Sequence, residues 1–216
     1  IESGGNYNTV VGDEAGTALT TGVHNTLIGS LAGDALTDAD KNVAVGYSAL
    51  STDTLGSRST AVGVSALGAQ NFTSATSAYN VGVGHNAGQG ITTGIKNTLV
   101  GGLAGDALTD ADNNTAIGYL ALSADTLGSK STAIGQGTLF AQNFTSATDT
   151  FNTAVGYLAG TAVTTGVQNT FIGGLAGDAT TTASYNTALG YASLGANTTG
   201  ADNTAVGRTA LENNTT

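Results

Sequence analysis

The chain contains no cysteine, no proline, no methionine and no tryptophan. Without cysteine it can form neither disulfide bonds nor thiolate metal sites. Only 6% of its 216 residues are aromatic and 9% are charged, and much of the 40% hydrophobic content is alanine, which buries little area per residue. With 33 glycines added, this composition argues against an ordinary globule. The alternative is a disordered low-complexity chain, and regular periodicity in the sequence would argue against it.

Basic residues are scarce as well: the sequence contains five of them and fifteen acidic residues, which gives a net charge of −10. A protein that binds nucleic acid needs clustered Lys and Arg to displace counterions from phosphates, and the five are scattered along the sequence. We therefore predict no nucleic-acid partner. The same shortage disfavours anionic membranes, and no apolar run is long enough to cross a bilayer, so we predict no membrane insertion either.

What the chain does have is one motif, Asn-Thr-x-aliphatic-Gly, that recurs twelve times, eight times in this form and four times with one of its first two residues replaced. Nine intervals have the length of the one from Asn8 to Asn25, and the two that begin at Ser59 and Ser131 are longer by four positions. A longer period is superimposed, because residues 8–79 resemble residues 80–151. Such repetition indicates a single solenoid domain over residues 1–216. The twelve coils begin at Asn8, Asn25, Asn42, Ser59, Asn80, Asn97, Asn114, Ser131, Asn152, Asn169, Asn186 and Asn203.

Each position of the coil follows its own rule. Position four is always aliphatic, position eight is alanine in ten coils, and position nine runs Gly, Gly, Leu, Leu through each block of four. Short β-branched runs before a glycine are typical of strands. We predict an all-β parallel solenoid of two short strands and two turns per coil, with position four in the interior. Twelve coils at about 4.8 Å each make a rod of about 58 Å.

Position five is glycine in every coil, which predicts a bend or a close approach of the backbone at that point. A β-branched residue there would fill a space that every coil keeps empty. We therefore take these twelve glycines as the structural residues of the repeat: Gly12, Gly29, Gly46, Gly63, Gly84, Gly101, Gly118, Gly135, Gly156, Gly173, Gly190 and Gly207.

One obligatory aliphatic per coil makes a thin core for a single chain. Self-association along a common axis would bury more surface. We therefore expect an oligomer, and among closed symmetries around a long axis a homotrimer, intertwined or side by side, that forms a rod.

The residues also resemble a known family. Asn186-Thr-Ala-Leu-Gly-Tyr-Ala-Ser-Leu-Gly-Ala-Asn-Thr-Thr-Gly200, followed by Asn203-Thr-Ala-Val-Gly207, is similar to the repeat arrays of phage tail fibres and related bacterial surface proteins. The same pattern resembles the head repeats of trimeric autotransporter adhesins, which implies a trimeric β-roll. The adhesin repeat is shorter, and Ser59 and Ser131 depart from the opening asparagine.

The resemblance implies the structural shaft of a viral tail fibre, or of a similar filament at the cell surface. The shaft would present a host-attachment tip, outside this segment, to a glycan or receptor. The leading alternative is a bacterial surface adhesin whose roll itself contacts the target. A third function is ice binding, because position two is threonine in ten coils, but Val43 and Val81 interrupt the row.

Enzymatic activity is not expected. The two histidines, His24 and His85, occupy different positions of separate coils, where exposed turns are the preferred interpretation. No glycine-rich segment is followed by the lysine of a phosphate-binding loop. We expect no cofactor.

Calcium is the one metal that the sequence suggests. Asp38 and Asp40, and their copies Asp110 and Asp112, place alternating carboxylates on a turn, and carboxylates are ligands that Ca²⁺ prefers. The third copy, Thr182-Ala-Ser-Tyr-Asn186, has neither carboxylate. We therefore favour a polar turn over a metal site.

Aromatic residues recur at two places. Tyr47, Tyr119, Tyr157 and Tyr191 occupy position six and either stack on sugars or, as we prefer, pack over the neighbouring turn. Phe72 and Phe144 mark the longer coils, where we expect protruding loops.

Both ends of the sequence fall inside a repeat. Residues 1–7 fit positions eleven to seventeen of a preceding coil, and the end at Thr216 matches Thr199, which precedes Gly200. We expect a glycine after Thr216 in the parent protein.

Overall fold

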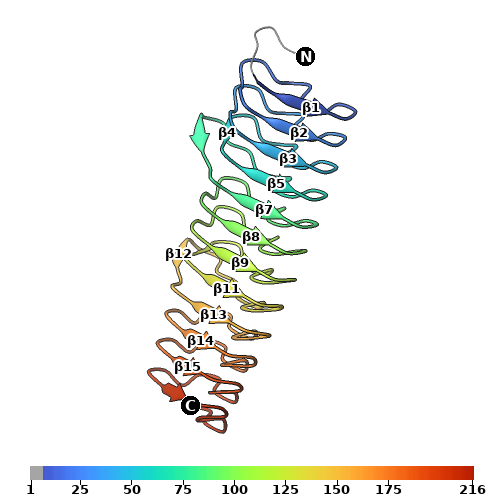
Figure 1. Ribbon diagram of the computed structural model, residues 1–216. Coiled ribbons are helices and arrows are strands. Elements are labelled where there is room, and N and C mark those ends of the chain that lie inside the picture. The colour runs from blue at the N-terminus through green and yellow to red at the C-terminus, as the bar shows by residue number, and fades with distance from the viewer. Residues whose placement is uncertain (1–6) are drawn as a thin grey trace.

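A computed structural model describes residues 7–216 and shows an all-β solenoid, a stack of coils with one strand of the main sheet in each (Figure 1). Twelve parallel strands form this sheet, so the prediction of a parallel β-solenoid is confirmed. Of the segment assigned to a preceding coil, residues 1–6 lie outside the described residues. The main-sheet strands, in spatial order, are β1 (Thr9–Val11), β2 (Thr26–Ile28), β3 (Val43–Val45), β5 (Thr60–Val62), β7 (Val81–Val83), β8 (Thr98–Val100), β9 (Thr115–Ile117), β11 (Thr132–Ile134), β13 (Thr153–Val155), β14 (Thr170–Ile172), β15 (Thr187–Leu189) and β16 (Thr204–Val206).

The prediction of two strands in each coil is wrong. Within residues 7–216, two further sheets form, each of two strands and each beside one of the longer coils. They pair β4 (Gly56–Ser57) with β6 (Thr76–Ser77) and β10 (Gly128–Ser129) with β12 (Thr148–Asp149). Elsewhere the chain turns too often to stay extended. Positions seven and nine both have positive φ in all twelve coils, so the chain bends twice soon after it leaves the main-sheet strand.

The glycines at position five form a stack in which successive backbones nearly touch. Their φ angles lie between +123° and +141°, a region that L side chains rarely adopt. A Cβ added to Gly118 would lie 2.4 Å from the carbonyl oxygen of Gly135 in the next coil. Glycine thus lets the coils stack at strand spacing.

Position three fills the core, and position four faces outward, so the sequence prediction that placed position four in the interior is wrong. Leu27 is fully buried whereas Ile28 is 38% exposed, and Ala116 is fully buried whereas Ile117 is 37% exposed. Alternate residues of a strand point to opposite sides, and the twelve strands pair position by position. Knowing which side of one strand is buried therefore fixes the buried side of all twelve.

The rule at position nine follows from packing against position three. Gly33 and Gly177 lie beside the large inward residues of their own coils: a Cβ on Gly33 would come within 2.8 Å of Leu27, and one on Gly177 within 2.6 Å of Phe171. Where position three is small, as at Ala116, position nine is a buried leucine such as Leu122 in most coils. At Ala154 it remains glycine, because a Cβ on Gly160 would come within 2.9 Å of Phe171 in the next coil. Large residues in the same or a neighbouring coil thus fill the core beside each of these glycines.

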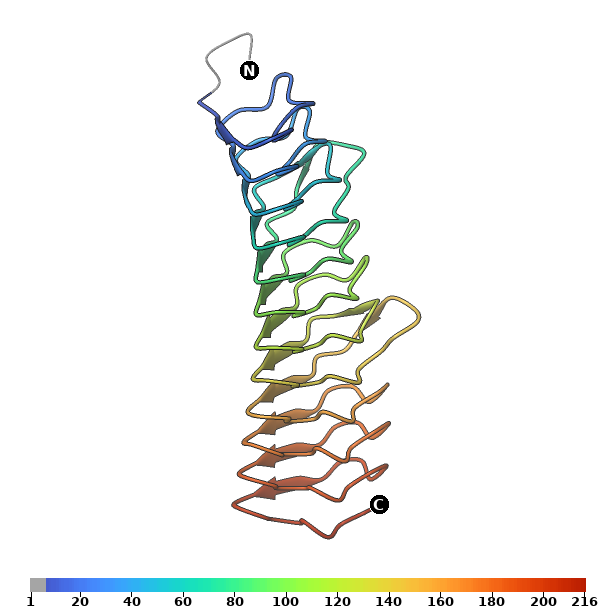
Figure 2. The same cartoon turned by 90° about the vertical axis from the view of Figure 1, so that its right-hand side faces the viewer.

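The sheet forms one side of the rod, and the longer coils extend on the other side (Figure 2). These coils do protrude, with residues 73–75 and 145–147 exposed at their tips. Phe72 and Phe144, however, are only 5% and 7% exposed. They anchor the loops to the body, and polar and small residues form the tips.

Candidate functional site

The interior contains a ladder of asparagines at the opening position. The backbone N–H of Asn114 donates to Oδ1 of Asn97 at 2.9 Å, and Oδ1 of Asn114 in turn accepts from the N–H of Ser131 at 2.8 Å. The Nδ2 group of Asn114 donates to the carbonyl oxygen of Gly128 at 2.9 Å. Because Asn97 and Asn114 are buried, these bonds satisfy backbone groups that water cannot reach.

Two buried carboxylates stand beside the serines that interrupt this ladder. Asp53 is fully buried, and its Oδ1 accepts from the N–H groups of Gly56 and Phe72, each at 3.0 Å. Its Oδ2 accepts from Nε2 of Gln70 at 2.5 Å. Each oxygen has a donor, so the cluster fastens the long coil.

The second long coil repeats this cluster, with Asp125 bonded to Gly128, Gln142 and Phe144. A sequence signal could have revealed both clusters. Asp53 and Gln70 recur as Asp125 and Gln142 at an unchanged spacing, and each pair joins a long coil, which contains the glutamine, to the coil before it, which contains the aspartate.

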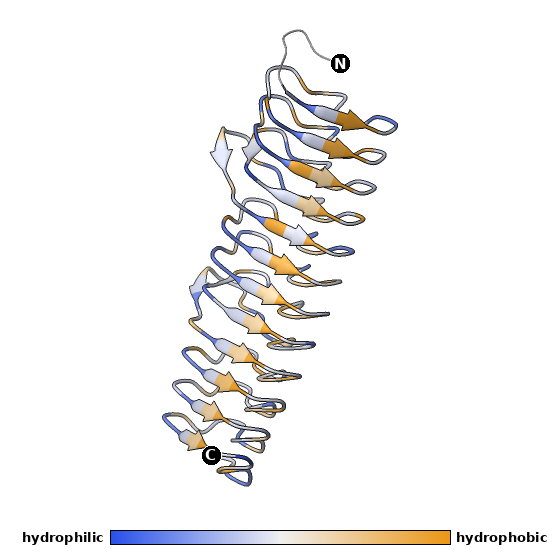
Figure 3. Ribbon diagram, in the orientation of Figure 1, coloured by the Kyte–Doolittle hydropathy of each residue, from blue (hydrophilic) through white to orange (hydrophobic). Residues whose placement is uncertain are grey.

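The outward side of the main sheet, which we call the sheet face, consists of the residues at positions two and four. Threonines form most of the first row, and the aliphatic residues form the second, with Leu189 46% and Val206 64% exposed. None of the residues at these two positions is charged. Figure 3 shows the apolar ends of the strands aligned in one row. The face is an uncharged surface on which neighbouring strands pair in regular register.

A third row of residues lies along one edge of this face. We call it the edge column, and it consists of the residue directly before each opening position. The structure corrects the sequence interpretation of the basic residues here, because four of the five share this column although they are scattered in sequence. All twelve members are exposed and have φ between +50° and +65°. They are Tyr7, His24, Lys41, Arg58, Tyr79, Lys96, Asn113, Lys130, Phe151, Gln168, Tyr185 and Asp202.

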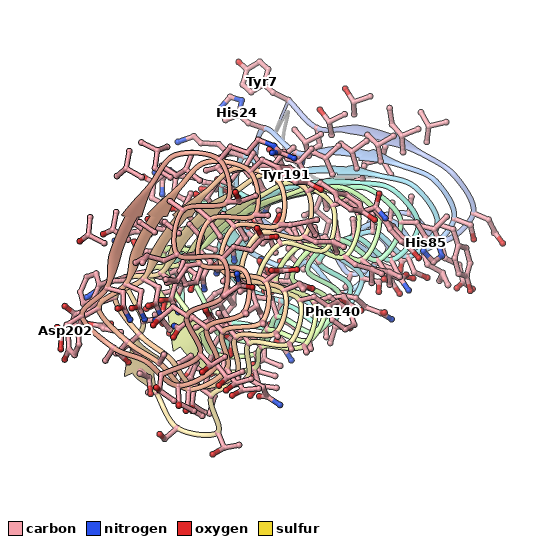
Figure 4. All side chains as sticks on the ribbon, turned by 90° about the horizontal axis from the view of Figure 1, so that it is seen from below. Tyr7, His24, His85, Phe140, Tyr191 and Asp202 are labelled. Carbon is pink, nitrogen blue, oxygen red and sulfur yellow. The ribbon has the colours of Figure 1, made fainter. Side chains whose placement is uncertain are left out.

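Neighbours in the edge column contact one another through their side chains. The rings of Tyr7 and His24 stack with centroids 5.3 Å apart, and Figure 4 shows both projecting from the same side of the rod. The guanidinium of Arg58 lies 5.6 Å from the ring centre of Tyr79. The ammonium of Lys130 lies 5.2 Å from the ring centre of Phe151. The column is therefore a surface of rings and cations.

The tyrosines at position six lie beyond the other edge of the sheet face. Tyr47, Tyr119, Tyr157 and Tyr191 are 51–54% exposed. A Cβ on Gly102 would lie 3.5 Å from Cδ2 of Tyr119, so this ring rests against the preceding coil, as the packing interpretation expects, and leaves its other side to solvent. Arg208, the fifth basic residue, lies 5.8 Å from the ring centre of Tyr191.

The four aspartates considered for calcium hydrogen-bond to the preceding coil. Asp38 accepts from the hydroxyl of Thr21 at 2.5 Å, and Asp40 accepts from the N–H of Val23 at 2.8 Å. Asp110 and Asp112 repeat these two bonds one block later. Among residues 7–216, no group of three or more His, Asp or Glu side chains is arranged to hold a metal ion. The geometry is that of polar turns.

A cavity of about 380 Å³ opens near the end of the rod, lined by Asp178, Tyr191, Gly195 and Glu212 among others. Burial raises the pKa of Asp178 above its ordinary value. A Cβ added to Gly195, which lines the cavity, would lie 3.5 Å from Oδ1 of Asp178. The two histidines lie far apart in the repeat, with His24 in the edge column and His85 at position six beyond the other edge.

A search of protein-family models, of curated protein sequences and of solved structures finds no match to this chain. Within the described part of the chain there is no helix that is both long and apolar enough to cross a membrane.

Proposed function

We propose that this chain is a shaft segment of a viral tail fibre or a similar surface filament, in which three copies pack side by side through the sheet face. The observation that carries the proposal is the face itself, an uncharged surface with an outward-facing aliphatic row along twelve strands, in which six residues are exposed and six are half-buried. Soluble monomers rarely leave so continuous an apolar surface uncovered. Packing three such faces around one axis buries the aliphatic rows of all three chains and gives a closed assembly.

The contacts between coils suit a mechanical role. Each coil is joined to the next by strand hydrogen bonds, and the asparagine ladder adds to them except after Ser59 and Ser131. The register is in phase throughout, with Thr115 opposite Thr132 and Ile117 opposite Ile134, for example. The longer coils leave the main sheet continuous, because they place their extra residues on the other side. Such a rod holds an attachment tip, outside this segment, at a fixed distance from a larger particle.

Light scattering on the purified chain tests the assembly. We expect three times the chain mass of 21.0 kDa. The variant Ile117→Lys places a charge in the middle of the sheet face and is expected to dissociate the trimer. Ala147→Lys, which adds the same charge to an exposed loop on the other side of the rod, is the control and is expected to remain trimeric. A wild-type chain that is folded and monomeric would contradict the proposal.

Ice binding is the second candidate, and the regular threonine row favours it. A monomeric rod would leave this row exposed beside the aliphatic row. Against it, only one of the two outward rows is threonine, and valines interrupt that row in β3 and β7. Thermal hysteresis of a monomeric sample, abolished by Thr115→Lys, would support this function over the shaft. The absence of thermal hysteresis would rule out ice binding.

A bacterial adhesin whose roll contacts the target remains the alternative to a shaft of viral origin. The two differ in which surface is used, because an adhesin requires a ligand on the side of the rod rather than at a tip.

A further inference from the structure

The edge column holds its side chains at a regular interval. The backbone N–H of Lys41 donates to the carbonyl oxygen of Val23 at 2.9 Å, and that of Lys96 to the carbonyl oxygen of Ala78 at 2.7 Å. Bonds of this kind join eight of the twelve column residues to the preceding coil, among them all four cations. One side chain therefore projects for every coil, at about the spacing of parallel strands, 4.8 Å.

Cations and neutral groups alternate along the middle of the column. Arg58, Lys96 and Lys130 stand two coils apart, at intervals of about 9.6 Å. Tyr79 stands between the first two cations, and Phe151 follows the third. Asn113 occupies the remaining place between Lys96 and Lys130. The middle of the column thus has a charge period of two coils.

The two halves of the chain keep this chemistry with different residues. Arg58 and Tyr79 correspond to Lys130 and Phe151 in the next block of four coils. Both pairs place a cation over a ring, with separations of 5.6 and 5.2 Å. The identities differ, but cation followed by ring is retained in each half.

We propose that the edge column binds a linear acidic polysaccharide in which charged and neutral sugar rings alternate. The carboxylate of every second sugar pairs with Arg58, Lys96 or Lys130. The neutral sugar between two of them lies on an exposed aromatic face, as at Tyr79, which is 52% exposed. Aromatic rings offer an apolar surface to the C–H groups of sugars, and cations supply charge complementarity.

The charge density of the column favours such a polymer over a nucleic acid. One nucleic-acid strand carries a phosphate about every 3.4 Å, far closer than Arg58, Lys96 and Lys130 stand to one another. Lys41, one coil before Arg58, is the one cation of the column with a cation as its direct neighbour. The protein is also acidic, and Asp40 and Asp112 directly precede two column residues. A polymer with sparse charges meets the cations without bringing many anions close to these carboxylates.

The contacts that the cations make within the protein leave them able to bind a ligand carboxylate. The ammonium of Lys130 pairs with Asp149 at 2.5 Å, but the two side chains are 41% and 51% exposed. Exposed pairs of this kind contribute little free energy, so a ligand carboxylate can compete for the lysine. The guanidinium of Arg58 donates to the hydroxyl of Ser77, a neutral partner, and keeps its charge available.

The test is binding of the whole chain to hyaluronate, a polymer of alternating acidic and neutral sugars, measured at low and at moderate salt. We expect binding that weakens with salt. The triple variant Arg58→Gln, Lys96→Gln, Lys130→Gln should weaken it about tenfold, the sum expected for three exposed ion pairs. Tyr79→Asn with Phe151→Asn should weaken it too, and asparagine tolerates the positive φ at both positions.

Matched controls exist at position six. Arg208→Gln and Tyr157→Ser remove the same kinds of side chain beyond the opposite edge of the sheet face and should leave binding unchanged. Neutral dextran should not bind. The proposal is overturned if hyaluronate does not bind at low salt, or if the control variants weaken binding as much as the column variants. It is also overturned if single-stranded poly(dT) binds more tightly and through the same residues, which would assign the column to nucleic acid. The shaft role is not assumed, because its own test is the mass of the assembly.

Discussion

Replacing Gly118 with alanine tests whether the glycine stack sets the spacing of the coils. The new Cβ would lie 2.4 Å from the carbonyl oxygen of Gly135 and 2.6 Å from its carbonyl carbon. Both are rigid backbone atoms that cannot rotate away. The coils would have to separate locally, or the backbone at position 118 would have to leave φ of +140°.

The cost can be calculated for the case in which the backbone keeps this φ and the coils separate. Holding a residue other than glycine at this φ costs about 1–3 kcal/mol. Separating the coils weakens the bonds from the N–H of Gly118 to Val100 and from the N–H of Gly135 to Ile117, now 2.8 and 2.7 Å long. Each backbone hydrogen bond contributes about 0.5–1.5 kcal/mol. Together the expected loss is about 2–6 kcal/mol, which lowers Tm by about 4–24 °C in a chain of this length.

The control is Gly102→Ala, the same substitution at a nearby glycine. A Cβ at Gly102 meets nothing closer than 3.5 Å, and the φ of this residue is not positive. Thermal unfolding followed by circular dichroism compares the two variants. Gly102→Ala should unfold within a few degrees of the wild type. If Gly118→Ala does the same, the close contact between glycines does not limit the spacing of the coils.

Three further predictions concern polar groups. Asn114→Ala leaves the carbonyl of Gly128 and the N–H of Ser131 without buried partners, so it should lower the free energy of unfolding by about 2–6 kcal/mol in a denaturant titration. The control, Asn143→Ala at an exposed position, should lower it by less than about 1 kcal/mol. Equal losses in the two variants would refute a role for the ladder. Burial raises the pKa of Asp178, so the stability that this group contributes at acid pH is lost as pH rises through its folded-state pKa. Asp178→Asn should therefore raise Tm at neutral pH and leave it unchanged at acid pH. A chelator should leave Tm unchanged, and a rise in Tm with added calcium would instead make Asp110 and Asp112 metal ligands.

The coil and its stacking could be predicted from the sequence because the repeat is so regular. A recurring interval with a constant glycine defines the unit, and twelve units define the stack. Alternation within Thr-Ala-Val shows that two sides exist, but not which side is buried, since alanine and valine are both apolar. The signal that decides it lies at Leu27, Leu99 and Phe171, where position three becomes large and position nine becomes glycine.

The edge column could not be seen by scanning for clusters along the sequence. A whole coil separates Lys41 from Arg58, and two coils, one of them a longer one, separate Arg58 from Lys96. They share a column only after each coil is counted as one step, whatever its length. Reading the residue before each opening position, rather than a window of neighbours, would have revealed it.

The repeat divides its positions between those that build the rod and those that distinguish one coil from another. The opening asparagine, the glycine of position five and the alanine of position eight touch the next coil, so a change there disturbs two coils at once. The residue before the opening position touches its neighbours only through its exposed side chain, and its backbone bond is independent of side-chain identity. Tyrosine, lysine, phenylalanine and aspartate all occupy it with similar φ. A solenoid of this design can therefore change the surface it offers to a ligand one coil at a time, while the stacking that makes it a rod stays the same.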